Sequence, residues 1–361
     1  MEVEKNIQMF KVQDLLKIAM EQSASDLQIT VGVPPVIKVR GELQYIGSEK
    51  LGVKDAERLV HELFSDEKAY QDFLESGDWD FSVSIPGLGR FRVNAFVQRG
   101  SHAAAIRLVL TNLPDPKDLL IPESVLDLHQ CNKGLVIVTG PTGSGKSTTL
   151  SCIIDLINST RKCHILTLEE PIEFLHRHKN SVVNQREIGQ DTKSYAKALR
   201  SALRESPDVI LVGEMRDLET ISIAITAAET GHLVLSTLHT LGAAKTIDRI
   251  IDVFPPNQQQ QIRIQLSTVL QAVVSQQLLP SPEKGRVAAF EIMAVNSAIR
   301  NLIRESKTYQ IDSAIHMGKS NGMQSMDYSI ADLYKRGLIS RETALLCALN
   351  HDVVEKYMEE F

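Results

Sequence analysis

The stretch Gly140-Pro-Thr-Gly-Ser-Gly-Lys-Ser-Thr148 follows a short apolar run, Leu135–Val138, and leads into a segment with apolar positions at helical spacing, Thr148–Ile157. A strand, a glycine-rich turn and a helix in this order are typical of a phosphate-binding loop. Its glycines let backbone N–H groups curl around phosphates, its lysine reaches the β and γ phosphates, and its serine holds Mg²⁺. The alternative is a plain glycine-rich turn. We therefore expect a nucleoside triphosphate bound by Gly140, Pro141, Thr142, Gly143, Ser144, Gly145, Lys146, Ser147 (also the Mg²⁺ ligand) and Thr148.

Bulk properties exclude several classes of partner. The 361 residues carry a net charge of −6, which does not favour nucleic acid or an acidic membrane surface as a partner. The cysteines form no Cys-x-x-Cys pair, so we expect no zinc site and no disulfide framework, and reduced thiols in a cytosolic protein. No stretch approaches 18 apolar residues, so we expect no direct membrane insertion and a membrane role only through a partner. The cysteines are Cys131, Cys152, Cys163 and Cys347.

Periodicity predicts two domains joined by a proline-containing linker at residues 112–117. Residues 1–111 show helical spacing at 10–21, 54–64 and 67–74, and strand patterns at 26–31, 36–39, 79–85, 90–98 and 103–110, which together indicate an α+β domain. From residue 118 to 361, apolar strands and helices alternate, as in a mostly parallel sheet covered on both faces. The part from about residue 296 to 361 is mainly helical.

Four apolar runs end at Thr139, Leu168, Gly213 and Leu238, and the phosphate loop or an ionisable residue follows each of them. Ligands of open parallel sheets lie outside the carboxyl ends of the strands, so these four ends are expected to meet at one site. Glu214 follows the third run, and Gly213 stands where many related sites have an aspartate. We assign Glu214 as the general base for the attacking water, with a solvated strand-end glutamate as the alternative.

The second run ends in an acidic turn, Glu169-Glu-Pro-Ile-Glu173. Such a turn on its own is more often a solvated loop than a site. Its place after a strand and beside three other strand ends favours a site instead. We expect Glu169 and Glu170 to hold waters on the Mg²⁺ ion and to polarise the nucleophile, and the role of Glu173 stays open.

Histidines flank the fourth run, and two arginines precede the third. His239 is a candidate sensor of the γ phosphate and His232 a further nucleotide-site candidate, although a lone strand-end histidine is usually structural. Arg200 and Arg204 lie four residues apart on a predicted helix and so share a face. They are candidates to bind phosphate or the acidic turn, with a plain surface pair as the alternative.

The first domain offers arginines that could neutralise charge on a transferring phosphoryl group. The strand pattern of residues 90–98 leaves Arg90 and Arg92 on one face and puts four apolar residues on the other: Phe91, Val93, Ala95 and Val97. Arg107 interrupts an apolar stretch, where a charge needs a partner. By alternation alone, these are ordinary strand-surface arginines.

With these residues in place, nearly the whole chain resembles the PilT family of type IV pilus retraction ATPases, within the secretion ATPase superfamily. The resemblance rests on the phosphate loop, the acidic turn known there as the aspartate box, and the segments 25–27, 32–35, 41–43, 184–187, 211–217, 229–232 and 237–239. Its most specific part is the segment that looks like the retraction motif: Ala298, Ile299, Arg300, Asn301, Leu302, Ile303, Arg304 and Glu305.

The resemblance implies a PAS-like first domain, a RecA-like second domain that binds ATP, and a ring of six subunits. It implies that Arg92 and Arg107 reach a shared nucleotide site, that Glu214 is the catalytic glutamate, and that His239 senses the γ phosphate. Glu170 stands where the family commonly has aspartate, so its side chain is longer by a methylene. The charge is preserved, and a role for Glu170 as a Mg²⁺ ligand through water stays an expectation.

The function implied is a cytoplasmic hexameric ATPase that retracts type IV pilus subunits and supports twitching motility, attached to the inner face of the cytoplasmic membrane through a pilus platform protein. An extension or type II secretion ATPase of the same superfamily is the nearest alternative, although the resemblance to those would imply a four-cysteine zinc site and an extra N-terminal region. A ring-shaped DNA translocase is a rival of another class, and the acidic balance counts against it. A nucleotide-gated scaffold without catalysis is a third.

Overall fold

The structure is a computed structural model that describes residues 11–39, 41–109, 113–283 and 285–359. Predictions that fall on Phe10, Leu110 and Asn112 lie outside these residues. The chain divides into two compact units, Met1–Asn112 and Leu113–Phe361, which are described separately below.

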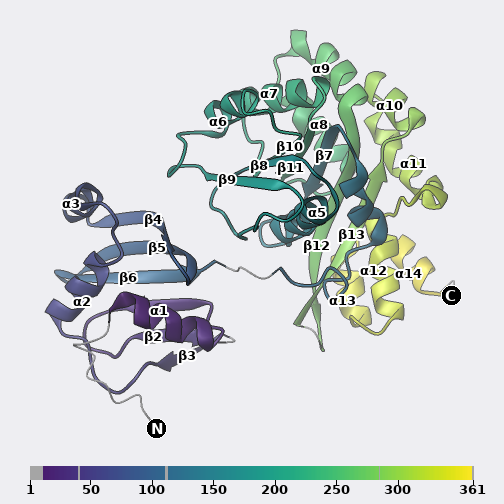
Figure 1. The fold of residues 1–361 in the computed structure, drawn as a ribbon. Coiled ribbons are helices and arrows are strands. Elements are labelled where there is room, and N and C mark those ends of the chain that lie inside the picture. Colours follow the sequence, from purple (N-terminus) through teal and green to yellow (C-terminus); the bar gives the residue numbers. More distant parts are fainter. Residues whose placement is uncertain (1–10, 40, 110–112, 284, 360–361) are drawn as a thin grey trace. The chain divides into compact units, whose positions relative to one another are not determined.

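The first unit is an antiparallel six-stranded sheet with helices (Figure 1), in the strand order β3-β2-β1-β6-β5-β4. Its strands are β1 (Asp26–Ile29), β2 (Val36–Val39), β3 (Glu42–Tyr45), β4 (Asp78–Ile85), β5 (Gly89–Gln98) and β6 (Ser101–Leu108), and its helices are α1 (Val12–Glu21), α2 (Val53–His61) and α3 (Glu67–Ser76). The apolar face predicted for α1 is buried, as at Leu15 and Leu16. Strand β3, whose residues are all exposed, was not predicted because it has no buried face to give it a pattern.

Alternation along β5 is confirmed where the strand crosses the core. Phe91 and Val93 are buried, whereas Arg92 is exposed. Val97, expected on the inner face, is 40% exposed, because this end of the strand extends beyond the core. Arg107 on β6 has the partner that its position requires, since its Nε lies 3.0 Å from Oδ1 of Asp26 on the paired strand β1.

The second unit is built on a seven-stranded sheet in the order β13-β12-β7-β11-β10-β8-β9. All neighbours are parallel except the β12–β13 hairpin. The strands are β7 (Gly134–Thr139), β8 (His164–Glu169), β9 (Val182–Glu187), β10 (Val209–Val212), β11 (Leu233–Leu238), β12 (Leu270–Ser281) and β13 (Gly285–Ala294). The mostly parallel sheet predicted from the alternation is confirmed, and so is the α/β fold class.

Helices cover both faces of this sheet (Figure 1), and successive residues of β7 point to opposite faces, where each set packs against helices. Leu135 and Ile137 pack into a core with helices α6 to α11, whereas Val136 and Val138 pack against α5. A third core lies between the β12–β13 hairpin and the last three helices. The helices are α4 (Glu123–Leu126), α5 (Lys146–Thr160), α6 (Tyr195–Ala202), α7 (Leu218–Glu229), α8 (Ala243–Asp252), α9 (Pro256–Val269), α10 (Ser297–Arg304), α11 (Ile311–Met317), α12 (Met326–Lys335), α13 (Arg341–Cys347) and α14 (His351–Glu359).

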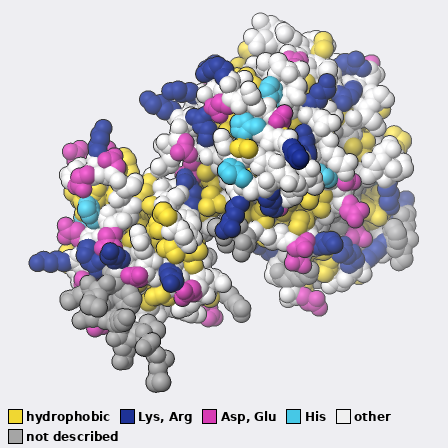
Figure 2. All heavy atoms as spheres, viewed as in Figure 1, with side chains coloured by type: hydrophobic (Ala, Val, Ile, Leu, Met, Phe, Trp, Pro, Cys, Tyr) yellow, Lys and Arg dark blue, Asp and Glu magenta, His cyan; other side chains and the backbone are white. Residues whose placement is uncertain are grey.

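The surface is mixed in charge. On the face drawn in Figure 2, lysine and arginine side chains are interspersed with aspartate and glutamate, in keeping with the net charge of −6. Within the described ranges, every helix is too short or too polar to span a bilayer.

Candidate functional site

The predicted phosphate loop joins strand β7, inside the sheet, to helix α5. Gly143 and Gly145 have φ values of +77° and +88°, which residues with a Cβ rarely adopt. A Cβ on Gly140 would lie 2.1 Å from the carbonyl oxygen of Gln276, so only glycine fits there. The Nζ atom of Lys146 donates to the carbonyls of Gly140 and Pro141, at 2.9 and 3.0 Å, and burial lowers its pKa. The loop is thus shaped for backbone contacts to phosphate, with a buried amine beside it.

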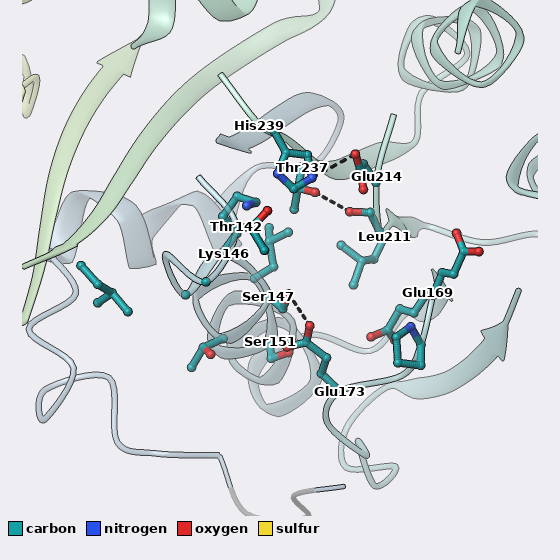
Figure 3. Close-up of a pocket in the computed structure, with 18 of the residues that line it drawn as sticks. Thr142, Lys146, Ser147, Ser151, Glu169, Glu173, Leu211, Glu214, Thr237 and His239 are labelled. Carbon is teal, nitrogen blue, oxygen red and sulfur yellow. Dashed lines mark hydrogen bonds and ion pairs between the residues drawn. The ribbon is translucent and has the colours of Figure 1, made fainter. Parts of the chain in front are cut away.

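The acidic turn after β8 lies beside this loop. The Ser147 hydroxyl donates to Oε1 of Glu173 at 3.1 Å, a link drawn in Figure 3. Glu173, whose role the sequence left open, is therefore the residue of the turn in contact with the predicted Mg²⁺ ligand. Glu170 is exposed, and it lines the cavity that Ser147 and Glu173 also line.

Glu169, at the end of β8, is the buried glutamate of the turn. Burial raises its pKa to about 7, although Thr167 Oγ1 and Gln185 Nε2 both donate to its Oε1, at 2.6 and 3.1 Å. Gln185 on β9 also donates to the carbonyl of Phe174 at 2.9 Å. Strand β9, which includes the segment 184–187, thus holds the acidic turn in place.

Glu214 lies just beyond β10 and has two side-chain partners. Its Oε1 is 3.0 Å from Nε2 of His239, which follows β11, and 2.7 Å from Nε of Arg216. Burial alone would raise the pKa of Glu214, but the hydrogen bonds from Arg216 and His239 outweigh burial and hold that pKa below its ordinary value. Glu214 is therefore ionised near neutral pH, as a general base has to be.

These groups line one cavity of about 480 Å³, into which the Ser147–Glu173 and Glu214–His239 pairs both face (Figure 3). The cavity lies at the carboxyl ends of β7, β8, β10 and β11, where the four apolar runs were predicted to meet. From the predicted residues it collects Thr142, Gly143, Gly145, Lys146, Ser147, Thr148, Glu169, Glu170, Glu214 and His239.

Other lining residues were not singled out from the sequence. Tyr195 begins α6, Leu278 lies on β12 and Arg286 on β13. Thr237, two residues before His239, lines the cavity and donates to the carbonyl of Gly213 at 2.5 Å. Thr237 belongs to the segment 237–239 of the resemblance, but no role was predicted for it, and Leu278 and Arg286 carry no signal of this kind.

Three nucleotide-site candidates lie elsewhere. His232 comes before β11, so it lies at the opposite edge of the sheet from His239 and contacts the carbonyl of Ala227 through Nδ1 at 2.9 Å. Arg200 forms an ion pair with Glu219 on α7. The prediction that Arg204 shares a helix face with Arg200 is wrong, because α6 ends at Ala202 and Arg204 lies in the turn that follows.

The predicted arginines of the first unit, Arg92 and Arg107, lie on neighbouring strands and are register partners across the β5–β6 pair. The segment resembling the retraction motif forms α10, with Ile299 and Ile303 buried and Asn301 and Arg304 exposed. The motif thus presents one apolar face to the core and one polar face to solvent.

Comparison with known proteins identifies a family. Residues 117–284 match the family of type II/IV secretion system proteins. The chain is 50% identical over 335 residues to the type IV pilus retraction ATPase PilT of Pseudomonas aeruginosa, which covers 92% of this chain and 96% of the relative. It is 46% identical over 346 residues to a twitching motility protein of Neisseria gonorrhoeae, covering 95% of this chain and 92% of the relative.

A solved structure is similar along almost the whole chain. The crystal structure of the pilus retraction motor PilT with bound ADP superposes with a TM-score of 0.88 and 48% identity, and the match covers 96% of this chain and 99% of the other. Similarity of this extent, together with the site described above, shows that the chain is an ATPase and belongs to the PilT family of type II/IV secretion system proteins.

Proposed function

We propose that this chain is the motor that withdraws type IV pili, using ATP hydrolysis to do mechanical work. The observation that carries the proposal is the match to pilus retraction proteins over nearly the full length of the chain, rather than over the ATPase core alone. The retained retraction motif at Ala298–Glu305 supports the same direction of movement.

Each group at the cavity has a role in phosphoryl transfer under this proposal. Glu214 takes the proton of the attacking water, and His239, hydrogen-bonded to Glu214, responds to the γ phosphate. Lys146 neutralises the β and γ phosphates, which it reaches by exchanging its contacts with the carbonyls of Gly140 and Pro141. General base catalysis of this kind contributes about 10²–10⁴-fold in rate.

The donor set fits a Mg²⁺ ion bound together with nucleotide. Ser147 offers a hydroxyl beside the Glu173 carboxylate, and Glu170 lines the same cavity. Mg²⁺ in such sites uses one or two protein oxygens, phosphate oxygens and water. When bound, the ion would neutralise charge on the phosphates, with Ser147 as the direct ligand and Glu170 acting through water.

We further propose a ring of six subunits in which Arg92 and Arg107 of one subunit approach the nucleotide of its neighbour. An arginine supplied in this way stabilises the charge that spreads over the γ oxygens in the transition state. The Asp26 partner of Arg107 would have to release it on assembly. The ring would work at the inner face of the cytoplasmic membrane by contacting the platform protein of the pilus.

Deletion of the gene in its own host tests the proposed function. Loss of a retraction motor leaves pili that form but cannot be withdrawn, so we expect more surface pili together with lost surface motility. Cells without pili would instead indicate an extension motor. Pili of normal number on cells with normal motility would contradict a role in retraction by this chain.

A further inference from the structure

Strand β12 places one residue directly beside the start of the phosphate loop. It runs parallel to β7, and the last register pair between them joins Ser275 to Thr139. The next residue of β12, Gln276, therefore lies alongside Gly140, where β7 ends and the loop begins. Gln276 is only 3% exposed, although its side chain is polar.

Gln276 contacts both ends of the phosphate loop. At the start of the loop, its carbonyl oxygen lies 2.1 Å from the position that a Cβ on Gly140 would take. At the far end, its Oε1 accepts a hydrogen bond from Thr149 Oγ1 at 2.8 Å, in the first turn of α5. Its Nε2 lies 2.9 Å from the corresponding Cβ position on Gly145. One buried residue therefore sets the separation between the two ends of the loop.

The neighbouring residue on β12 contacts the segment that carries His239. Ser275 Oγ accepts from the backbone N–H of Gly242 at 3.0 Å. Glu291, its register partner on β13, accepts from the N–H of Ala243 at 2.7 Å. Consecutive residues of β12 thus hold the two loops that meet at the cavity, one on each face of the strand.

We propose that Gln276 is a positioning residue of the ATPase site. It keeps the phosphate loop in the conformation that binds phosphate, and strand β12 keeps that loop in register with the histidine segment through Ser275. Gln276 does not line the large cavity, so it acts through the loop and not by touching the phosphates. The inference rests on the proposed nucleotide site.

The physical reason lies in the cost of ordering the loop. A loop already held at both ends loses little conformational freedom when nucleotide binds, whereas a released loop loses more, and that loss weakens binding. Removal of the Gln276 amide also leaves the buried Thr149 hydroxyl without a partner, which destabilises the fold. A useful experiment has to separate these two effects.

Paired apolar variants achieve that separation. Gln276→Leu removes the amide, Thr149→Val removes the hydroxyl, and the double variant leaves neither group unsatisfied, so it regains most of the folding stability lost by the single variants. We expect binding of a fluorescent ADP analogue to weaken about tenfold in both single variants and to stay weakened in the double variant. Stability is followed by thermal unfolding of the nucleotide-free chain.

Two controls complete the test. Gln277→Leu makes the same change one residue along β12, on the opposite face, and should leave ADP affinity unchanged. Thr149→Ser keeps the hydroxyl that Thr149→Val removes, so it should bind ADP with wild-type affinity. Wild-type ADP affinity in the double variant would overturn the proposed role of Gln276, since a residue with only a structural role changes stability alone. Failure of the unaltered chain to bind ADP would overturn the proposed nucleotide site, and this inference with it.

Discussion

The carboxylate of Glu214 and the imidazole of His239 are 3.0 Å apart, although the two residues follow different strands. Strands β10 and β11 are parallel neighbours, so their carboxyl ends bring the two side chains to the same edge of the sheet. A change at the γ phosphate that moves His239 therefore acts directly on the proposed base. This link gives the site a way to couple nucleotide state to the chain that follows β11.

Glu214→Gln should lower ATP turnover by about 10²–10⁴-fold, because the amide cannot accept the proton of the attacking water. Nucleotide binding should persist, since Gln keeps an oxygen to accept from His239. Phosphate release and binding of a fluorescent ATP analogue measure the two properties. Glu219→Gln, on the exposed side of α7, is the matched control and should turn over normally. Wild-type turnover by Glu214→Gln would refute the assignment.

Arg216→Gln should move the acid limb of the pH–rate profile to higher pH. The hydrogen bond and charge of Arg216 help to hold the pKa of Glu214 below its ordinary value, so their loss raises that pKa. A base works only when deprotonated, so a higher pKa makes activity fall at a higher pH as the solution is acidified. The measurement is kcat/KM as a function of pH. An acid limb at the wild-type position would contradict this account of Glu214.

Lys146→Ala should abolish tight nucleotide binding while the chain stays folded. The lysine supplies a positive charge to the phosphates. It is only 8% exposed, and two backbone carbonyls of the loop hold its amine in place. Equilibrium binding of labelled ATP and far-UV circular dichroism measure the two effects. Lys197→Ala, on an exposed position of α6, should bind as wild type. Equal affinities of the two variants would count against the phosphate-loop assignment.

Glu291→Gln should remove part of the pH dependence of stability. Burial raises the pKa of Glu291 to about 7, with Asp312 and Asp327 adding to the shift. A carboxyl with a raised pKa stabilises the fold below its unfolded-state pKa, and that stability is lost as pH rises through the folded-state value. The free energy of unfolding lost in this way between about pH 5 and about pH 8 is on the order of 2 kcal/mol. Urea unfolding at the two pH values measures it. An unchanged difference between the two pH values in the variant would exclude Glu291 as the source.

The two faces of α10 should respond differently to substitution. Ile303 is fully buried, so Ile303→Ala should lower the free energy of unfolding by about 2–5 kcal/mol. Arg304 is exposed, so Arg304→Ala should leave folding and ATPase activity intact but impair pilus withdrawal if that face contacts a partner. Urea unfolding, phosphate release and pilus counts separate the outcomes. Normal withdrawal in Arg304→Ala cells would remove that residue from the motor interface.

The sequence predicted the centre of the site because local patterns determine it. The phosphate loop follows from the spacing around Lys146, and the strand ends at Glu169, Glu214 and His239 follow from apolar runs that stop at polar residues. In a parallel sheet these ends lie at one edge, which the alternation predicts. The neighbouring positions of β7, β11, β10 and β8, which bring the ends together, come from the structure. The α/β fold class followed from the same alternation.

The supporting residues could not be predicted in this way. Gln185 and Gln276 act through contacts with loops that are distant in sequence, and a polar residue in a buried strand gives no periodic signal for its partner. His232 was placed at the nucleotide site because it flanks β11. It precedes that strand, however, and only residues that follow a strand lie at its carboxyl end. Arg204 was misplaced because propensity does not fix the last turn of a short helix such as α6.

The central claim is that hydrolysis at this site withdraws pili, and imaging of labelled pili on living cells tests it most directly. Cells that carry only the Glu214→Gln chain should extend pili that never shorten, whereas cells with the unaltered chain should extend and withdraw them repeatedly. Withdrawal at the wild-type frequency in the Glu214→Gln cells would contradict the account.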